Sequence, residues 1–467
     1  MTSPFKAAAS LPVPDRLAWW QESRMGMSLH FGAYSVPARG EWIRSINRVS
    51  VADYQPWVDA LVPDSGCCRE WAKLAKRMGA KYVVLTTKHH DGFCLFDSQH
   101  TTYTTMHSPA QRDIVREYVE ALRAEGLRVG LYYSLVDWHH PDYPAWQDRQ
   151  HPLRHDPASE ARDAQGDWSR YVRYMQAQVE ELCTNYGTID LFTFDFSYWD
   201  FHGEKWGATE LVKMIRRLQP TAVFNDRLGR EGIKQAAPPA YVGDFDHAEQ
   251  DIPNQPVCNA VGERIPWESW FTLNNSWCHS LHDRDWKKPA DIIRALVNCV
   301  SKGGNLMINV GPDARGHVAP EAVQICEAVG DWMLRNSESI RGCGNADLPV
   351  PEWGRFTRRG NYLYAHLLHQ PIGHFNLSGL RGWVKDARVL ATGTEALICD
   401  YWNPGIQTFD APDDIFCNLN ANTAGTYPLP DATDAVVRFT VTTEAEREKL
   451  LAGYRTAFAR SQERKPF

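Results

Sequence analysis

The sequence has no cluster of basic residues and no long apolar run, and these two absences exclude several classes of partner. Its formal net charge is −7, with Lys and Arg scattered along the chain. We therefore expect no nucleic-acid partner, because phosphate binding requires clustered Lys and Arg. No run of about 18 apolar residues exists, so we expect no membrane span and no membrane partner.

A secretory signal and a disulfide pattern are also missing. The first residues contain no apolar segment of the kind that signal peptides carry, which favours a cytoplasmic protein, with a trimmed secreted chain left open. The 11 Cys include one adjacent pair, Cys67-Cys68, and no Cys-x-x-Cys. An odd, unpatterned set of this kind is typical of free thiols in a reducing compartment. No feature predicts the oligomeric state.

A further absence concerns the fold. No Gly-x-Gly-x-x-Gly follows the first expected strand, which argues against a doubly wound, dinucleotide-binding sheet. Apolar strand patterns instead alternate with amphipathic helix patterns through residues 1–345. We expect strands at 28–34, 82–88, 128–134, 189–195, 222–227, 243–249, 267–272 and 305–312. The alternation predicts an α/β fold, with a (β/α)8-like (TIM-type) barrel as the first domain.

The hydrophobic pattern of the sequence changes near residue 350. Short alternating apolar runs, such as Asn361–Leu368 and Ala435–Val441, are separated by turn residues. This pattern predicts a C-terminal β-sandwich as the second domain, covering residues 346–467.

The run Ile189–Asp195 has the pattern of a buried strand and ends in a carboxylate. Catalytic side chains of parallel barrels lie at the C-terminal ends of the strands. Asp195 is therefore the first candidate for a catalytic carboxylate, with a turn-capping role as the alternative. Other expected strand ends also carry groups that bind or ionise: His30, His89, His90, Tyr133, Arg227 and Glu249. We interpret this coincidence as a candidate active site.

The two carboxyl groups of this set, Asp195 and Glu249, fit glycoside hydrolysis. One carboxylate attacks the anomeric carbon and the other carboxyl group protonates the leaving oxygen. The His, Tyr and Arg side chains can donate hydrogen bonds to sugar hydroxyls. Aromatic residues make up 12% of the chain, with 18 Trp, and Trp42 and Trp277 can pack on an apolar sugar face. The alternative is that most Trp lie in the core.

The rival chemistry is metal-assisted hydrolysis with His30, His89, His90 and Asp91 as ligands. Adjacent His on a strand point to opposite faces, so both bind one ion only where the strand has already turned. No His-x-His or His-x-x-x-His spacing occurs near them. We therefore expect no metal and no cofactor.

Four segments, in this order and spacing, resemble the α-L-fucosidases of glycoside hydrolase family 29: Leu29–Gly32, Thr87–Phe93, Gly130–Ser134 and Ser301–Pro312. The resemblance runs from about Trp19 to Gly342. It implies a retaining exo-glycosidase with a barrel and a C-terminal β-sandwich. It also implies activity without a metal, on fucosylated oligosaccharides or glycans.

By position, the resemblance implies that Asp195 is the nucleophile and Glu249 the general acid/base. It implies that fucose is bound by His30, Trp42, His89, His90, Tyr133 and Arg227. The sequence departs from the family pattern beside the nucleophile, where Thr193 and Phe196 replace the usual Trp and Gly. Glu268 stays open as an alternative acid/base.

Two other functions stay open. A different exo-glycosidase on the same fold would act on a galactose-type sugar, which has CH₂OH where fucose has a methyl group. A barrel that has lost its activity would bind sugar without cleaving it, although the presence of both carboxylates argues against this. The sequence does not indicate the linkage or the aglycone.

Overall fold

The computed structural model describes residues 3–5, 9–198, 200–229, 232–371, 375–399, 413–419 and 428–463. Two compact units divide the chain. One is formed by Ser10–Pro289 and Asn305–Asp331, and the other by Met1–Ala9, Ala290–Gly304 and Trp332–Phe467. The boundary predicted between residues 345 and 346 stays a prediction. No helix in the described part of the chain is long and apolar enough to cross a membrane.

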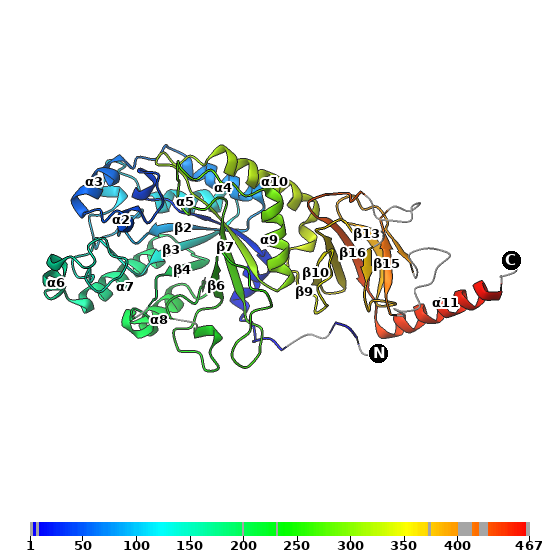
Figure 1. Ribbon diagram of the computed structural model, residues 1–467. Helices are drawn as coiled ribbons and strands as arrows, with labels where there is room; N and C mark the ends of the chain where they lie inside the picture. Colours follow the sequence, from blue (N-terminus) through cyan, green and yellow to red (C-terminus); the bar gives the residue numbers. More distant parts are fainter. Residues whose placement is uncertain are drawn as a thin grey trace. The chain divides into compact units, whose positions relative to one another are not determined.

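The first unit contains the predicted barrel (Figure 1). Its eight strands pair in the order β5-β4-β3-β2-β1-β8-β7-β6, and every adjacent pair is parallel. The strands are β1 (Met25–Leu29), β2 (Tyr82–Lys88), β3 (Arg128–Ser134), β4 (Leu191–Asp195), β5 (Val223–Phe224), β6 (Asp246–Glu249), β7 (Trp267–Thr272) and β8 (Asn305–Val310). Apolar side chains fill the interior below the strand ends, among them Val84, Leu191, Phe245 and Met307.

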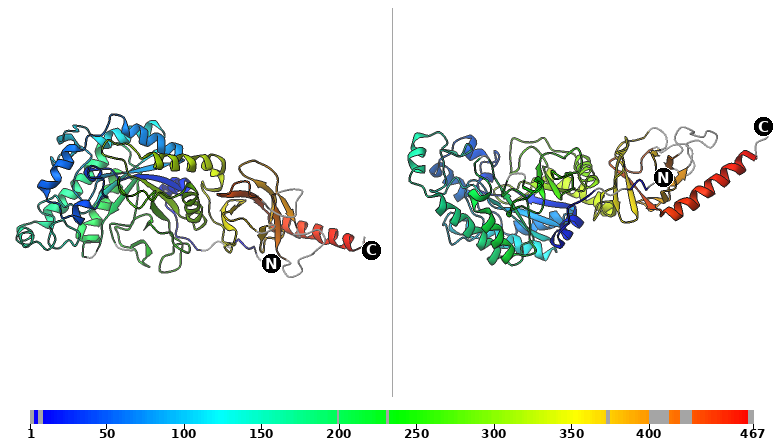
Figure 2. Two further views of the ribbon diagram at one scale, coloured as in Figure 1. Left: turned by 45° about the horizontal axis from the view of Figure 1, so that its top comes forward. Right: turned by 90° about the horizontal axis from the view of Figure 1, so that it is seen from below.

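Helices cover the first four strands on the outside (Figure 2). They are α4 (Cys67–Met78), α5 (Ile114–Ala124), α7 (Trp168–Asn185) and α8 (Ala208–Leu218), and α10 (Pro320–Asn336) follows β8. Helix α5 shows how local signals set the start and the buried face of such a helix. In α5, the Asp113 side chain accepts the N–H of Arg116 at the N-terminus, and Ile114, Tyr118 and Leu122 face the core. In the described residues no α-helix separates β5, β6 and β7, so the strand–helix alternation breaks there.

Three strand predictions were misplaced. The sixth strand begins at Asp246 and not at residue 243. The first strand runs from Met25 to Leu29 and not from residue 28 to 34. It includes Gly26, which leaves room for the Tyr82 ring, since a Cβ there would meet that ring at 2.6 Å. The fifth strand ends at Phe224 and not at residue 227. The chain turns there, and Asp226 accepts the N–H groups of Ile233 and Gly243 at 2.6 and 3.0 Å.

β5 and β6 are the two ends of the eight-stranded sheet, and the barrel closes where they meet, a junction called the seam here, with few backbone hydrogen bonds. Asn225 and Phe245 form an isolated parallel bridge between the two strands. Asp244 fastens the seam with its side chain, which is 2% exposed. Its carboxylate accepts hydrogen bonds from Arg16 and Arg216, at 2.5 and 2.7 Å, and from the N–H of Phe224 at 3.0 Å. One buried carboxylate thus joins the N-terminal segment, α8 and β5.

The second unit contains the predicted β-sandwich. One sheet has the order β13-β16-β11-β10-β9 and the other β12-β15-β14, with antiparallel pairing in both. The strands are β9 (Gly344–Asn345), β10 (Gly354–Arg359), β11 (Tyr362–Leu367), β12 (Phe375–Leu377), β13 (Val384–Val389), β14 (Leu397–Cys399), β15 (Ile415–Asn418) and β16 (Ala435–Val441). One core contains side chains of both sheets, including Leu363, Phe375, Cys417 and Val437. The chain ends in helix α11 (Glu444–Glu463), and this unit also includes most of α9 (Pro289–Ser301).

Replacing Asp244 by Ala should destabilise the barrel unit by about 2–4 kcal/mol, because two Arg side chains and one N–H lose their buried partner. The free energy of unfolding in urea, followed by Trp fluorescence, measures this change. The matched control is Glu210→Ala, which removes an exposed ion pair with Lys213 and should cost less than about 0.5 kcal/mol. Equal effects of the two substitutions would contradict the role of Asp244.

Candidate active site

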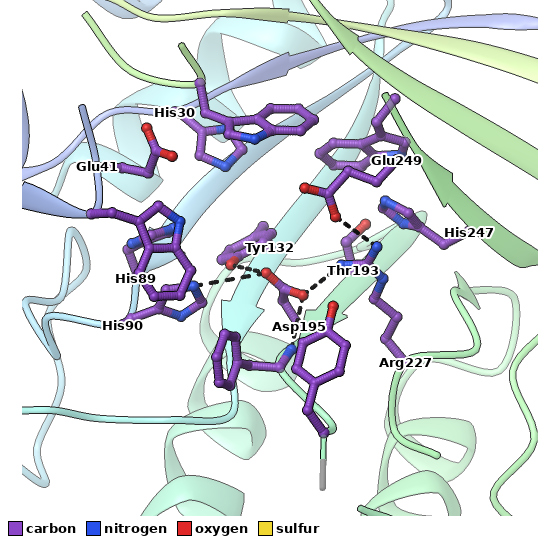
Figure 3. Close-up of a pocket in the computed structure, with 15 residues that line it drawn as sticks. His30, Glu41, His89, His90, Tyr132, Thr193, Asp195, Arg227, His247 and Glu249 are labelled. Atoms are coloured by element: carbon purple, nitrogen blue, oxygen red, sulfur yellow. Dashed lines mark hydrogen bonds and ion pairs between the residues drawn. The ribbon is translucent and has the colours of Figure 1, made fainter. Parts of the chain in front are cut away.

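One pocket opens at the C-terminal ends of the barrel strands, and all of its residues belong to the barrel unit (Figure 3). Fifteen side chains line it: His30, Glu41, Trp42, His89, His90, Tyr132, Thr193, Asp195, Phe196, Tyr198, Arg227, His247, Glu249, Trp270 and Trp277. They come from seven strand ends and from the loop after β1. The structure therefore brings together all the residues predicted from the sequence except Tyr133.

Asp195 lies at the end of β4 and points into the pocket (Figure 3). One carboxylate oxygen accepts a hydrogen bond from the Tyr132 hydroxyl at 2.7 Å. The other accepts from Arg227 at 2.7 Å and from the N–H of Phe196 at 2.8 Å. Its side chain is 17% exposed. Three donors hold this carboxylate in one orientation at the base of the pocket.

The pKa of Asp195 reflects two opposed effects. Burial is the largest single effect and raises the pKa, but the charge of Arg227, the contribution of His90 and the hydrogen bonds from Tyr132 and Arg227 together outweigh it. The pKa of Asp195 is therefore held well below its usual range. Burial lowers the pKa of His90 to about 4, so His90 is neutral at pH 7 and Arg227 supplies the charge. Asp195 is an ionised carboxylate at neutral pH.

Arg227 also binds Glu249, at the end of β6. One terminal nitrogen of Arg227 donates to Asp195 at 2.7 Å, and the other terminal nitrogen donates to Glu249, also at 2.7 Å. The Arg227 side chain is 18% exposed, and that of Glu249 is 40% exposed. One guanidinium thus holds a half-buried carboxylate on one side and an exposed carboxylate at the pocket mouth on the other.

Three neutral imidazoles lie on the side of the pocket formed by β1 and β2. His30 pairs through Nδ1 with Asn309 at 2.7 Å, and His90 pairs through Nδ1 with Ser134 at 2.6 Å. Burial lowers the pKa of His30 to about 4 and that of His89 well below its usual value. The Nε2 atoms of His30 and His90 are left to face the pocket, where neutral rings can accept or donate hydrogen bonds.

Two buried polar atoms of the lining have no hydrogen-bond partner among the described residues: Nδ1 of His89 and Oγ1 of Thr193. His89 is 4% exposed and Thr193 1%. Buried polar groups are nearly always paired, so these two atoms indicate a polar ligand or water in the pocket. Figure 3 shows Thr193 between Asp195 and His247.

Aromatic rings form the walls. Trp277 lies 5.1 Å from the ring of His30, and Trp42 lies 5.0 Å from the ring of His90. Trp270, Phe196 and Tyr198 complete the apolar surface. The pocket therefore combines flat apolar faces with a few convergent polar groups, as small-molecule sites do.

The prediction that Tyr133 lines the pocket was wrong, and the neighbouring Tyr132 takes that place. Successive side chains of a strand point to opposite faces, so Tyr132 points into the barrel and Tyr133 toward the helices. The Tyr133 hydroxyl donates to Gln178 of α7 at 2.8 Å, and the Lys88 ammonium lies 4.4 Å from its ring centre. Val129, Leu131 and Tyr133 share one apolar face of β3, and this pattern could have indicated that Tyr133 packs against the helices.

The structure shows which of two further glutamates, Glu41 and Glu268, lines the pocket. Glu41, which was not predicted from the sequence to be a site residue, lines the pocket and is 8% exposed. Burial raises the pKa of Glu41, and an N–H from Cys278 at 3.3 Å partly offsets this. Glu268 does not line the pocket: it is fully buried in the barrel, where its carboxyl group accepts hydrogen bonds from Tyr82 and, at 2.7 Å, from Trp270. Burial raises the pKa of Glu268 to about 7.

Nothing in the described part of the chain groups three or more His, Cys, Asp or Glu side chains in an arrangement that could hold a metal ion. The adjacent rings of His89 and His90 pack on each other, with centres 4.0 Å apart. The chemistry offered by the site is that of three carboxyl groups, those of Glu41, Asp195 and Glu249, one Arg and several neutral hydrogen-bonding groups.

A parallel barrel that presents paired carboxylates and aromatic walls at its strand ends defines a glycoside hydrolase. Comparisons with known proteins make this specific. The family model for α-L-fucosidase matches residues 6–338, and the chain belongs to that family.

Relatives of known structure resemble both units of the chain. α-L-Fucosidase isoenzyme 1 from Paenibacillus thiaminolyticus is 50% identical, with a TM-score of 0.87, over 92% of this chain and 99% of that one. A Bacteroides thetaiotaomicron family 29 α-L-fucosidase, trapped as a covalent intermediate with 2-fluoro-fucosyl fluoride, is 27% identical over 94% of this chain and 98% of its own, with a TM-score of 0.78. Human tissue α-L-fucosidase is 28% identical over 78% of this chain and 77% of its own.

Replacing Arg227 by Met should raise the pKa of Asp195, because burial persists while the largest effect that opposes it, the charge of Arg227, is removed. Asp195 would then take up its proton at a higher pH than in the wild type. A ¹³C NMR titration of protein labelled at the Asp carboxyl groups measures the shift. Tyr132→Phe is the control, since it removes one hydrogen bond, keeps the charge and should raise the pKa less. An unchanged pKa in Arg227→Met would contradict the role of Arg227.

Proposed function

We propose that this protein is a retaining, exo-acting α-L-fucosidase that releases terminal α-L-fucose from fucosylated oligosaccharides or glycans. Asp195 is the nucleophile and Glu249 the general acid/base. The observation that carries this proposal is that one guanidinium, Arg227, bonds to both carboxylates at 2.7 Å. Family membership supports the choice of sugar, and the geometry of the site supports the roles proposed for the residues.

The shared guanidinium supports double displacement. Because Asp195 and Glu249 bond to two nitrogens of one guanidinium, their carboxyl groups are neighbours in the pocket, as double displacement requires. Retaining glycosidases need a separation of about 5–5.5 Å between the carboxyl groups, whereas inverting enzymes need about 6.5–9.5 Å to admit a water molecule. The covalent intermediate trapped in the Bacteroides relative is consistent with the same chemistry.

The first step forms a glycosyl ester. The Asp195 carboxylate attacks the anomeric carbon while the bond from that carbon to the leaving oxygen breaks, and Glu249 gives its proton to that oxygen. Arg227 keeps Asp195 ionised before the attack. In the second step Glu249 removes a proton from water, and the water oxygen displaces Asp195. Two inversions leave the configuration unchanged.

The lining of the pocket suits a 6-deoxy sugar. His30, His89 and His90 present neutral ring nitrogens to the sugar hydroxyls, and Glu41 adds a buried carboxyl group. Trp42 and Trp277 offer flat apolar faces to ring C–H groups and to the methyl group. The pocket is closed below by the barrel core, so only a terminal residue of a glycan fits.

One observation favours the galactose-type alternative. The Thr193 hydroxyl is buried and has no partner among the described residues, and a CH₂OH group could bond to it where a methyl group could not. The two sugars are distinguished by the ratio of kcat/KM values for their 4-nitrophenyl glycosides. A non-catalytic sugar-binding barrel would turn over neither.

Hydrolysis of 4-nitrophenyl α-L-fucoside, followed by proton NMR, tests the proposed function. We expect turnover and the α-anomer as the first-formed fucose, because two displacements preserve the configuration. Mutarotation equilibrates the anomers later, so the spectrum is recorded during the first minutes. First release of the β-anomer would contradict double displacement, and no turnover of the fucoside would contradict the proposed activity.

Azide rescue separates the roles of the two carboxylates. Asp195→Ala should lose nearly all activity, and azide should restore part of it by attacking from the vacated side, which gives the β-azide. Glu249→Ala should spare the first step for a nitrophenyl leaving group and abolish cleavage of an oligosaccharide, and azide should then yield the α-azide.

Glu268→Ala and Glu41→Ala are the controls for the acid/base assignment. Neither should give the α-azide, since Glu268 lies outside the pocket and Glu41 lies on its far wall from Asp195 (Figure 3). Formation of the α-azide by either variant, with normal oligosaccharide cleavage by Glu249→Ala, would move the acid/base to that residue and leave the nucleophile unchanged.

A further inference from the structure

We infer that Tyr198, braced by Phe196, binds the sugar on the leaving-group side of the scissile bond, and that this sugar is a hexopyranose stacked on the ring through an apolar C–H face. This inference rests on the proposed function. It deepens that function by assigning the acceptor subsite to the loop after β4. No role in fucose binding is required of either aromatic residue.

Exposure places Tyr198 at the mouth of the pocket. Of the fifteen lining residues, only Tyr198 and Glu249 are exposed, and the others are buried or half-buried. Tyr198 is 38% exposed. An exo-acting pocket holds the terminal sugar inside, so the next sugar must lie at the mouth. The general acid must also reach the leaving oxygen there, which is where Glu249 lies.

Tyr198 lines the same pocket as the reacting groups Asp195 and Glu249 and the Arg227 that bonds to both. Burial of part of the ring raises the pKa of Tyr198, and the charges that act on it are those of Arg227, Asp195 and Glu249. A sugar stacked on this ring therefore lies at the pocket mouth, where Glu249 also lies.

Phe196 has a backbone conformation that a bulky residue rarely adopts. Its φ is 76°, in the left-handed region that favours Gly. The Phe196 N–H donates to the Asp195 carboxylate at 2.8 Å, and this bond does not depend on the φ of Phe196. Gly, the usual residue of the family here, would make the same bond without strain. The strain therefore serves the side chain and not the backbone bond.

The Phe196 ring packs between residues of the pocket wall and Tyr198 at the pocket mouth. Its centre lies 4.9 Å from that of His90 and 4.9 Å from that of Tyr198, edge-on to both. It is also 5.7 Å from Trp42. Tyr198 is therefore held by a ring that is itself packed between two pocket residues.

Hydrogen bonds of the loop hold both rings in place. Ser197, between them, donates its hydroxyl to the carbonyl of Leu228 at 2.9 Å and accepts from the indole of Trp206 at 3.0 Å. The N–H of Phe201 donates to the carbonyl of Tyr198 at 2.9 Å. A strained residue persists when its surroundings fix it in this way. The backbone around Tyr198 is thus fixed and its ring packs on that of Phe196, which lowers the entropic cost of binding a ligand there.

A fixed, half-exposed aromatic face beside a catalytic acid selects a flat apolar partner. Galactose and related hexopyranoses present such a face through adjacent C–H groups, and their hydroxyls stay in water at the rim. A peptide or lipid aglycone has no comparable rigid face. The Tyr198 ring therefore favours glycans whose fucose is attached directly to a hexopyranose.

The test compares two substrates that share fucose and differ in the leaving group. One is the fucosyl-galactose disaccharide that the wild type cleaves fastest, and the other is α-L-fucosyl fluoride, whose leaving group has no ring. For Tyr198→Ala, kcat/KM for the disaccharide divided by kcat/KM for the fluoride should fall at least tenfold. Tyr198→Phe, which keeps the ring, should change this ratio less than threefold.

Phe196→Gly is the second variant, because it keeps the N–H bond to Asp195 and removes the brace. It should lower the same ratio, with the thermal midpoint of unfolding confirming that the protein is folded. Tyr362→Ala, at a Tyr that is 41% exposed on β11 of the other unit, should leave the ratio unchanged.

The outcomes distinguish this inference from the function on which it rests. A wild type that hydrolyses neither substrate overturns the proposed function and the acceptor subsite with it. A wild type that hydrolyses both, with Tyr198→Ala lowering both kcat/KM values equally or neither, overturns the acceptor subsite alone and leaves the fucosidase function standing.

Discussion

The shared guanidinium of Arg227 is the interaction on which the site depends. It keeps Asp195 ionised in a half-buried position and holds Glu249 at the mouth, each at 2.7 Å. Arg227 follows β5 and Glu249 ends β6, and these are the two strands between which the barrel is closed by a single bridge. The buried carboxylate of Asp244 fastens that seam. The geometry of the two reacting carboxylates therefore depends on an ion-pair cluster at the seam.

Much of the fold could be predicted because its signals are local. β2 and β3 begin and end where the apolar patterns do, and the sandwich strands follow the alternating runs. The limits of β1 and β5 could not be predicted in this way. They depend on contacts across the barrel: Gly26 makes room for the Tyr82 ring, and Asp226 turns the chain by binding two distant N–H groups. Tertiary packing overrides local propensity there.

The site was predictable to the extent that it follows from strand ends. Asp195, Arg227 and Glu249 meet because parallel strands share one edge. The choice between Tyr132 and Tyr133 required the direction of the pleat, and the choice between Glu249 and Glu268 required the depth of each residue in the barrel. Phe196 was visible only as a departure from the Gly that its family usually has, and its conformation explains why that departure has consequences for the pocket wall.

The central claim is that Asp195 becomes covalently bonded to fucose during turnover. A fluorine at the sugar 2-position slows both steps, and a fluoride leaving group restores the first, so 2-fluoro-fucosyl fluoride should trap the intermediate. Intact-mass spectrometry should show the gain of one fluorofucosyl group, and fragmentation of the proteolytic peptides should locate it on Asp195. A label on Glu249 or Glu41 instead, or an unlabelled protein that still cleaves fucosides, would contradict the account.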